Sequence, residues 1–169
     1  MIAPLRPGVT LPQGAAVIGT ERLRLRQGRD MAPYAAMLSD PGTARFVTVD
    51  GKPVVDEMTG WRHTVVNGGH WVIHDAGMFV VEEKSSGRGG RRAGRGFEVG
   101  WGIAKEFRGK GYALEAARAS VDWAFATFDI DEISHCIDCE NLASQGAARR
   151  LRAPKSAKSN CSAIPPISG

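Results

Sequence analysis

The sequence has few cysteines and contains no long apolar run. Its three cysteines, Cys136, Cys139 and Cys161, are too few for a disulfide scaffold and are typical of a reducing compartment. No segment approaches the roughly 18 consecutive apolar residues of a membrane span. The first 20 residues are broken by prolines and do not resemble a signal peptide. These absences predict a soluble, cytoplasmic protein with no membrane partner.

Several site motifs are missing as well. There is no G-x-x-x-x-G-K-[ST] loop, no G-x-G-x-x-G dinucleotide fingerprint and no G-x-S-x-G nucleophile elbow. Cys136 and Cys139 have the C-x-x-C spacing, but no second pair would complete a zinc site. His63, His70 and His74 are expected on separate elements, as surface or hairpin residues. The sequence therefore predicts no metal.

The formal net charge of +4 does not select a partner, since it suits an anionic small ligand as well as a nucleic acid. Four arginines fall in the glycine-rich stretch "KSSGRGGRRAGRG", residues 84–96, which predicts a flexible loop. Such a tract binds RNA when aromatic residues add stacking to charge. None is interleaved here, so nucleic acid is disfavoured as a partner.

The hydrophobic pattern predicts one α/β domain, because apolar residues make up 43% of the chain and helical and strand periods alternate. Residues 1–19 are expected to form a flexible arm, residues 20–151 the domain, and residues 152–169 an irregular tail. Within the domain, strands are predicted at 20–27, 70–75, 78–83, 97–103 and 132–139, and helices at 31–40, 54–66, 112–128 and 144–151.

The strand predicted over "FEVGWGI", residues 97–103, has two unlike faces. One face carries Phe97, Val99, Trp101 and Ile103, and the other carries Glu98, Gly100 and Gly102. Glycine inside a strand often marks close approach of a ligand to the backbone. A bulge or a weak strand is the alternative explanation.

The next segment, "KEFRGKGYALEAA", residues 105–117, places a basic, glycine-rich turn directly before a helix. The first turn of a helix has unpaired N–H groups and a partial positive charge, so it binds anions. Gly109 and Gly111 would let these N–H groups surround phosphate oxygens, with Arg108 and Lys110 adding charge at the rim. A phosphate site is the functional interpretation, and a surface turn is the structural one.

This combination resembles the GNAT superfamily of N-acetyltransferases, whose coenzyme A motif is [QR]-x-x-G-x-[GA]. Here the motif reads Arg108, Gly109, Lys110, Gly111, Tyr112, Ala113. The segment "ENLASQGAARRL" is similar to the N-x-x-S segment of the branch that acetylates ribosomal-protein amino termini. The opening of the domain is also similar to that branch, and the resemblance covers roughly residues 20–151.

The resemblance implies a mixed, mostly antiparallel sheet that splays near residues 97–103 and 132–139, with helices on both faces. It implies acetyl-CoA as co-substrate and an amine, either a protein amino terminus or a small molecule, as acceptor. The amine would attack the thioester directly in a ternary complex. The residues with implied roles are Arg108 to Ala113 at the pyrophosphate, Ile103, Ala104 and Asn141 at the pantetheine arm, Ser144 as proton donor to the thiolate, and Glu98 as the base that acts through water.

Alternatives remain for the two catalytic candidates. A carboxylate beside a glycine face can have its pKa raised toward the working pH, which suits a general base. Glu98 could equally be an ordinary paired carboxylate. Ser144 has a side chain of the kind that caps helix N-termini.

The end of the chain departs from the family. These domains have L-G and two further strands after the last helix, whereas here Leu151 is followed by Arg152 and a proline- and serine-rich tail. A missing or altered C-terminal hairpin would expose the edge of the strand at 132–139 and favour a homodimer. The altered tail also favours a second hypothesis, a non-catalytic coenzyme A binding protein. A third hypothesis is a basic RNA-associated module that uses the loop at residues 84–96.

Overall fold

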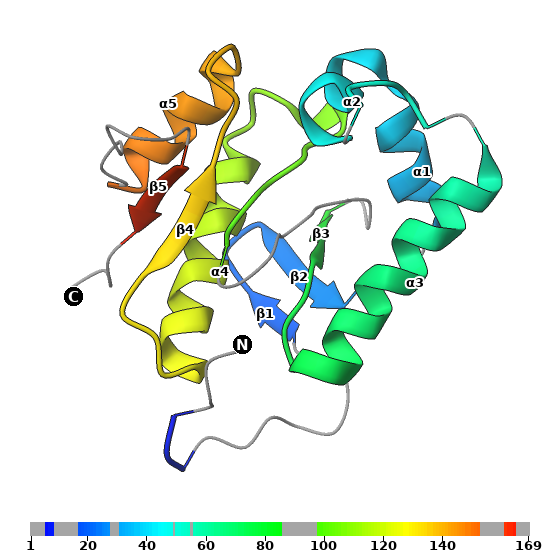
Figure 1. The fold of residues 1–169 in the computed structure, drawn as a ribbon. Coiled ribbons are helices and arrows are strands. Elements are labelled where there is room, and N and C mark those ends of the chain that lie inside the picture. The colour runs from blue at the N-terminus through cyan, green and yellow to red at the C-terminus, as the bar shows by residue number, and fades with distance from the viewer. Residues whose placement is uncertain are drawn as a thin grey trace.

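The computed structural model describes residues 6–8, 17–27, 31–48, 50–54, 56–85, 98–152 and 161–164. Strands and helices follow one another in mixed order (Figure 1). The elements are β1 (Val17–Gly19), β2 (Leu23–Gln27), α1 (Met31–Ser39), α2 (Pro41–Val47), α3 (Glu57–His74), β3 (Phe79–Glu83), the 3-10 turn η1 (Lys105–Phe107), α4 (Tyr112–Thr127), β4 (Ile133–Cys136), α5 (Leu142–Arg150) and β5 (Cys161–Ile164). No helix within these ranges is long and apolar enough to cross a lipid bilayer.

The strands form two antiparallel sheets that lie apart from each other. One sheet has the order β1-β2-β3, and the other pairs β4 with β5 (Figure 1). An isolated parallel bridge between Glu98 and Ser134 joins the segment before η1 to β4. The predicted α/β fold, with a mostly antiparallel and splayed sheet, is confirmed.

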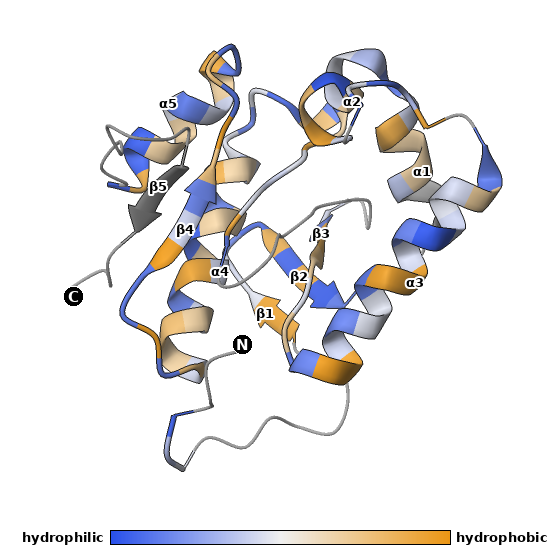
Figure 2. Ribbon diagram, in the orientation of Figure 1, coloured by the Kyte–Doolittle hydropathy of each residue, from blue (hydrophilic) through white to orange (hydrophobic). Residues whose placement is uncertain are grey.

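Strand β2 follows the predicted alternation. Leu23 and Leu25 are 0% exposed, while the arginines between and after them point to the other face. Figure 2 shows this strand alternating between hydrophobic and hydrophilic colours. Its neighbour β3 pairs in antiparallel register, and Arg26 forms an ion pair of 2.5 Å with Glu82 across the two strands. The polar face is thus held by charge while the other face enters the core.

Helix α4 is the element shared by both halves of the core. Val121 and Ala124 pack with Ile133 in one cluster, whereas Tyr112 and Ala116 pack with the β2 leucines in another. The helix predicted at residues 112–128 is therefore confirmed. Since α4 touches both sheets, its N-terminus is fixed relative to each of them.

Helix α3 corrects the predicted strand at residues 70–75. Asp56 caps its N-terminus by accepting from the Thr59 N–H at 2.7 Å, and the helix continues to His74. Trp71 is buried and donates its indole N–H to the Met78 carbonyl at 2.9 Å. This tertiary packing outweighs the low helix propensity of glycine and β-branched residues, which had suggested a break.

Residues 98–104 form no regular strand, which corrects the prediction for 97–103. Only Glu98 takes part in a bridge within the described part of this segment, and Phe97 lies outside the described residues. Two interior glycines weaken a strand because they have no side chains to pack. At Gly102 the expected open face is filled, since an added Cβ would lie 3.2 Å from the Met37 methyl group.

Both predicted chain ends contain more structure than expected. Residues 17–19, assigned to a flexible arm, form β1 and pair with β2. Further toward the N-terminus, the Arg6 guanidinium donates to the Phe125 and Phe128 carbonyls at the end of α4. In the predicted irregular tail, residues 161–164 form β5, which gives β4 an antiparallel neighbour. The expectation that β4 lacks a partner strand was wrong.

The end of α5 bears out the misfit expected from an arginine after the helix. Arg152 has a φ of 59°, in the left-handed region that favours glycine. We expect Arg152→Gly to raise the free energy of unfolding by about 1 kcal/mol, because it removes this backbone strain. Urea unfolding followed by circular dichroism measures the change. The control is Arg150→Gly inside α5, which should destabilise; a loss of stability in Arg152→Gly would contradict the account.

Candidate functional site

The loop of residues 108–113, called the cradle loop below, leads directly into α4. Gly109 and Gly111 have φ angles of 79° and 81°, a conformation that other residues adopt only with strain. Gly111 is the N-cap of α4, and an added Cβ at Gly109 would meet no atom within 4 Å. The two glycines therefore have the backbone conformation that the predicted site requires, and the space beside Gly109 is open.

The backbone N–H groups of the cradle loop decide whether it has donors to offer. The Arg108 N–H donates to the Lys105 carbonyl at 3.3 Å. Among the described residues, no acceptor is bonded to the N–H groups of residues 109–114. Unpaired N–H groups at a helix N-terminus form a ready anion site, because the helix dipole adds partial positive charge.

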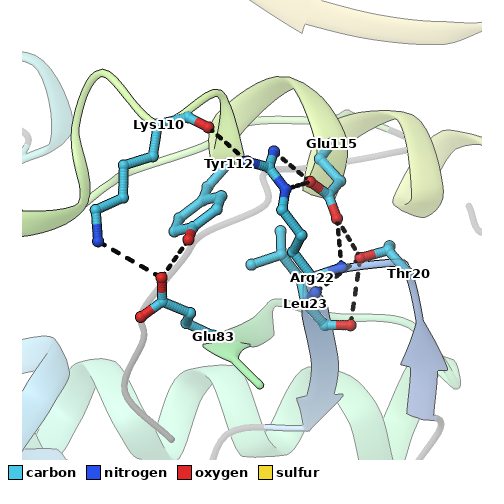
Figure 3. A network of polar contacts seen from close by, with 7 residues as sticks. All are labelled: Thr20, Arg22, Leu23, Glu83, Lys110, Tyr112 and Glu115. Carbon is cyan, nitrogen blue, oxygen red and sulfur yellow. Dashed lines mark hydrogen bonds and ion pairs between the residues drawn. The ribbon is translucent and has the colours of Figure 1, made fainter. Parts of the chain in front are cut away.

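Ionic and hydrogen-bonding contacts from the first sheet fix the loop (Figure 3). The Arg22 guanidinium donates to the Lys110 carbonyl at 3.0 Å and forms an ion pair with Glu115 at 2.5 Å. Glu115 also accepts from the Thr20 hydroxyl at 2.5 Å. Burial alone would raise the pKa of Glu115, but the hydrogen bonds from Thr20 and Arg22 outweigh it and lower that pKa.

A second contact set lies on the other side of the loop. The Tyr112 hydroxyl donates to Glu83, which raises the tyrosine pKa. The Lys110 ammonium lies 3.5 Å from the same carboxylate and 5.6 Å from the Tyr112 ring centre (Figure 3). The Lys110 ammonium therefore points toward Glu83 of β3.

Arg108 connects the loop to α2. Its guanidinium forms an ion pair with Asp40 at 3.0 Å and donates to the Thr43 hydroxyl and to the Ile103 carbonyl. Asp40 is the N-cap of α2, so a second helix, which was not predicted, begins at Pro41 directly after α1 ends at Ser39. Hydrogen bonds from Thr43 and then from Arg108 hold the pKa of Asp40 below its ordinary value. The Arg108 side chain thus has a positioning contact rather than the free rim charge that the sequence suggested.

We expect Glu115→Gln to lower the melting temperature by about 3 °C at pH 7, since it weakens the contacts that join β1 and β2 to α4. Because folding lowers the Glu115 pKa, the carboxylate stabilises the fold above its unfolded pKa. This stabilisation is lost as pH falls through the folded pKa. The difference between the two proteins should therefore shrink toward pH 3 in thermal melts. Glu132→Gln, at an exposed position, is the control, and an equal loss there would contradict this role.

A cavity of about 960 Å³ opens between the two sheets. Its wall takes residues from α2, α3, β3, α4, β4 and α5 and from the segment 98–101. Of the predicted site residues, Glu98, Asn141 and Ser144 line this cavity together. Ile103, Ala104 and the cradle loop are not among its described lining residues. Helix α4 connects the two parts, because its first turn follows the loop and Ser120 faces the cavity.

Asn141 and Ser144 also have a structural relation. The Asn141 side-chain oxygen accepts the Ser144 N–H at 3.1 Å, so Asn141 is the N-cap of α5. The sequence suggested Ser144 as the capping residue, but it lies three positions into the capped turn. Its hydroxyl is therefore not required for the cap.

His135 was not predicted as a site residue. It is 2% exposed, its Nδ1 lies 2.6 Å from the Val99 carbonyl, and its ring stacks on Trp101 at 4.3 Å. A carbonyl oxygen only accepts, so Nδ1 carries the proton of this hydrogen bond. The contact holds the segment carrying Glu98 against β4. The alternation of Ile133 and His135 in the predicted strand was the signal that placed this ring inward.

Three more histidines meet at the same cavity, which corrects their assignment to separate surface elements. His63, His70 and His74 all belong to α3 and all line the wall. Their spacing of seven and four residues is that of one helix face. The predicted strand at 70–75 concealed this spacing. Within the described residues, no group of three or more histidine, cysteine or carboxylate side chains is arranged to hold a metal.

Comparisons with known proteins complete the description. Residues 22–153 match the acetyltransferase (GNAT) domain family. The chain belongs to the GNAT family. A member of this family is an acetyltransferase that takes its acyl group from acetyl-CoA, so the predicted family and enzyme class are confirmed. The arginine-glycine stretch, for which an RNA role was considered, lies outside the described residues from position 86 to 96.

The relatives of this GNAT protein include one of unknown activity. The "Uncharacterized protein YkkB" of Bacillus subtilis is 26% identical over 145 residues, covering 78% of this chain and 81% of its own. The Agrobacterium tumefaciens acetyltransferase is 24% identical, with a TM-score of 0.72 and coverage of 95% and 99%. Mycobacterium smegmatis RimJ in complex with CoA-disulfide is 15% identical, with a TM-score of 0.68 and coverage of 91% and 88%. These structures share the fold with the present chain.

Proposed function

We propose that this GNAT protein is an N-acetyltransferase that moves the acetyl group of acetyl-CoA to a primary amine. The cradle loop would bind the pyrophosphate through the N–H groups of residues 109–113, and the cavity would receive the amine. The supporting observation is the set of N–H groups left without acceptors among the described residues, at a helix N-terminus fixed by Arg22, Arg108 and Tyr112. Because the loop is already held in place, an anion that binds there gains hydrogen bonds and no conformational entropy is lost in ordering the loop.

The pantetheine arm would run from the cradle loop toward the cavity. Tyr112 and Ser120 are eight residues apart on α4, which corresponds to about 12 Å along the helix axis. The N–H groups of Ile103 and Ala104 have no acceptor among the described residues, so they suit pairing with the amide groups of an extended arm. The carbonyl of Ile103 already accepts from Arg108, and that of Ala104 accepts from Phe107. Asn141, at the cavity wall, would contact the arm near its sulfur end.

The chemical step needs a base, an electrophile and a proton donor. Glu98 would take a proton from the ammonium of the acceptor through a water molecule. The free amine would attack the thioester carbonyl carbon, forming the C–N bond of the amide as the C–S bond breaks. Ser144 would give its hydroxyl proton to the departing thiolate. The nitrogen loses a second proton once the C–N bond has formed, and this proton would return through solvent to the Ser144 oxygen. The side chains of Glu98 and Ser144 face one cavity, as this sequence of steps requires.

Thiol release from acetyl-CoA over a panel of primary amines tests this function. We expect release that depends on the amine, together with the acetylated amine in mass spectra. A second candidate, coenzyme A binding without transfer, is favoured by the altered chain end, where Arg152 replaces the usual glycine. Coenzyme A binding in calorimetry with no thiol release for any amine would favour that candidate and refute the transferase.

A further inference from the structure

We propose that the acceptor of this enzyme is a primary amine with an aromatic or apolar body and no anionic group. The inference rests on the proposed function, since it concerns what the cavity admits beside the acyl donor. We infer this acceptor class from the charged side chains and the apolar side chains of the cavity wall. The relevant wall residues come from α2, α3, β3, α4 and β4 and from the segment that carries Glu98.

With its histidines counted as neutral, the described part of the cavity wall has a negative formal charge. Besides four histidines, the acidic or basic side chains that the structure describes there are Glu98 and Asp138, and both are carboxylates. This contrasts with the whole chain, whose net charge is +4. A protonated amine approaching such a wall is attracted, whereas a carboxylate or phosphate on the same molecule is repelled and loses its water.

Two arginines near this wall are engaged elsewhere. Arg45 precedes the wall residue Phe46, but its guanidinium forms an ion pair with Glu140 and lies 5.2 Å from the Phe46 ring centre. Arg108 is held by Asp40 and Thr43. An acceptor carboxylate would have to break one of these pairs to reach either guanidinium.

Aromatic and aliphatic side chains form another part of the wall, beside its histidines and the polar side chains of Asn67, Ser120, Asn141 and Ser144. Phe46, Trp101, Trp123 and Phe79 contribute rings from four different segments, and Ile133 and Ile137 add aliphatic surface. Such a wall stabilises an apolar body by burial, and the faces of its rings favour a cationic amine. A cavity of about 960 Å³ can hold the thioester end and an acceptor of the size of phenylalanine amide.

A matched pair of ligands tests this substrate class. Phenylalanine amide and phenylalanine differ in one anionic group and share the amine and the ring. Calorimetry on the full chain saturated with coenzyme A, at pH 8 where imidazoles are largely uncharged, should give a Kd about tenfold lower for the amide. Equal binding, or tighter binding of phenylalanine, would overturn the proposal.

A matched pair of variants tests whether the cavity makes the choice. Val66 lines the cavity and is 61% exposed, so Val66→Lys adds a cation there without disturbing the core. Val65, its neighbour on α3, is 49% exposed and lies outside the described wall, so Val65→Lys adds the same charge elsewhere. We expect Val66→Lys to remove or reverse the preference for the amide, and Val65→Lys to keep it. An unchanged preference in both variants would refute the cavity as the selective site.

Turnover with the same ligands separates this inference from the function on which it rests. Thiol release with phenylalanine amide and little with phenylalanine supports both. A binding preference without thiol release refutes the transferase and keeps the ligand class. Thiol release with the opposite preference refutes the ligand class alone.

Discussion

Gly109→Val is expected to weaken coenzyme A binding about 10- to 100-fold, the effect of losing one or two charge-assisted hydrogen bonds. The space beside Gly109 is open, so a valine side chain would project into the volume proposed for the pyrophosphate. Its φ of 79° is also strained for a β-branched residue, which would turn the neighbouring N–H groups away. Calorimetric titration with coenzyme A measures the Kd.

Gly8→Val is the matched control for Gly109→Val. Gly8 has a φ of 82° and no atom within 4 Å of an added Cβ, but it lies outside the proposed site. It should suffer a similar backbone strain and leave coenzyme A binding unchanged. Gly109→Asn separates the two causes, because asparagine tolerates this φ and yet fills the open space. Unchanged affinity in both Gly109 variants would rule out the cradle loop as the phosphate site.

Glu98→Gln is expected to lower kcat about 100-fold with the Kd for coenzyme A almost unchanged, since a positioned general base contributes a factor of this order. The substitution keeps the size of the side chain and removes its ability to accept a proton. Glu98 is half-buried beside the bridge to Ser134, so the amide retains the local packing. Steady-state thiol release and calorimetry give the two quantities.

The control for Glu98→Gln is Glu132→Gln, which removes the same charge at an exposed position near β4. It should leave kcat within about twofold of the parent enzyme. A pH profile adds a readout that packing alone would not change, because the rise of kcat with pH should disappear when the base is removed. Full activity in Glu98→Gln would assign the proton transfer to another group.

The sequence predicted the elements whose evidence is local. The alternation of Leu23 and Leu25 predicts β2, and the apolar period of residues 112–128 predicts α4, which the structure shows as Tyr112–Thr127. The glycine spacing at 109 and 111 predicted a turn before that helix. In each case the hydrophobic pattern and the local backbone propensity favour the same structure, and the tertiary contacts are compatible with it.

The predictions failed where long-range packing chose between local alternatives. Residues 70–75 were predicted as a strand, but burial of Trp71 against β3 keeps residues 70–74 in α3. The opposite error occurred for the strand that alternation predicted at residues 97–103. Its two glycines leave the described residues 98–103 without regular strand pairing. Residues 17–19 and 161–164 carry weak patterns of their own and become strands only because β2 and β4 offer hydrogen-bonding edges.

The amino-acid sequence by itself determined the family and the helix N-terminus with its two glycines, and it supplied the residue types proposed to act near the thioester. These properties depend on neighbours in the chain, whose spacing the sequence records. Only the tertiary structure decided that three histidines of α3, a buried histidine of β4 and Glu98 share one cavity, and that Arg22, Arg108 and Tyr112 hold the cradle loop. Such contacts join residues far apart in the chain, and their geometry arises when the two sheets pack against α4.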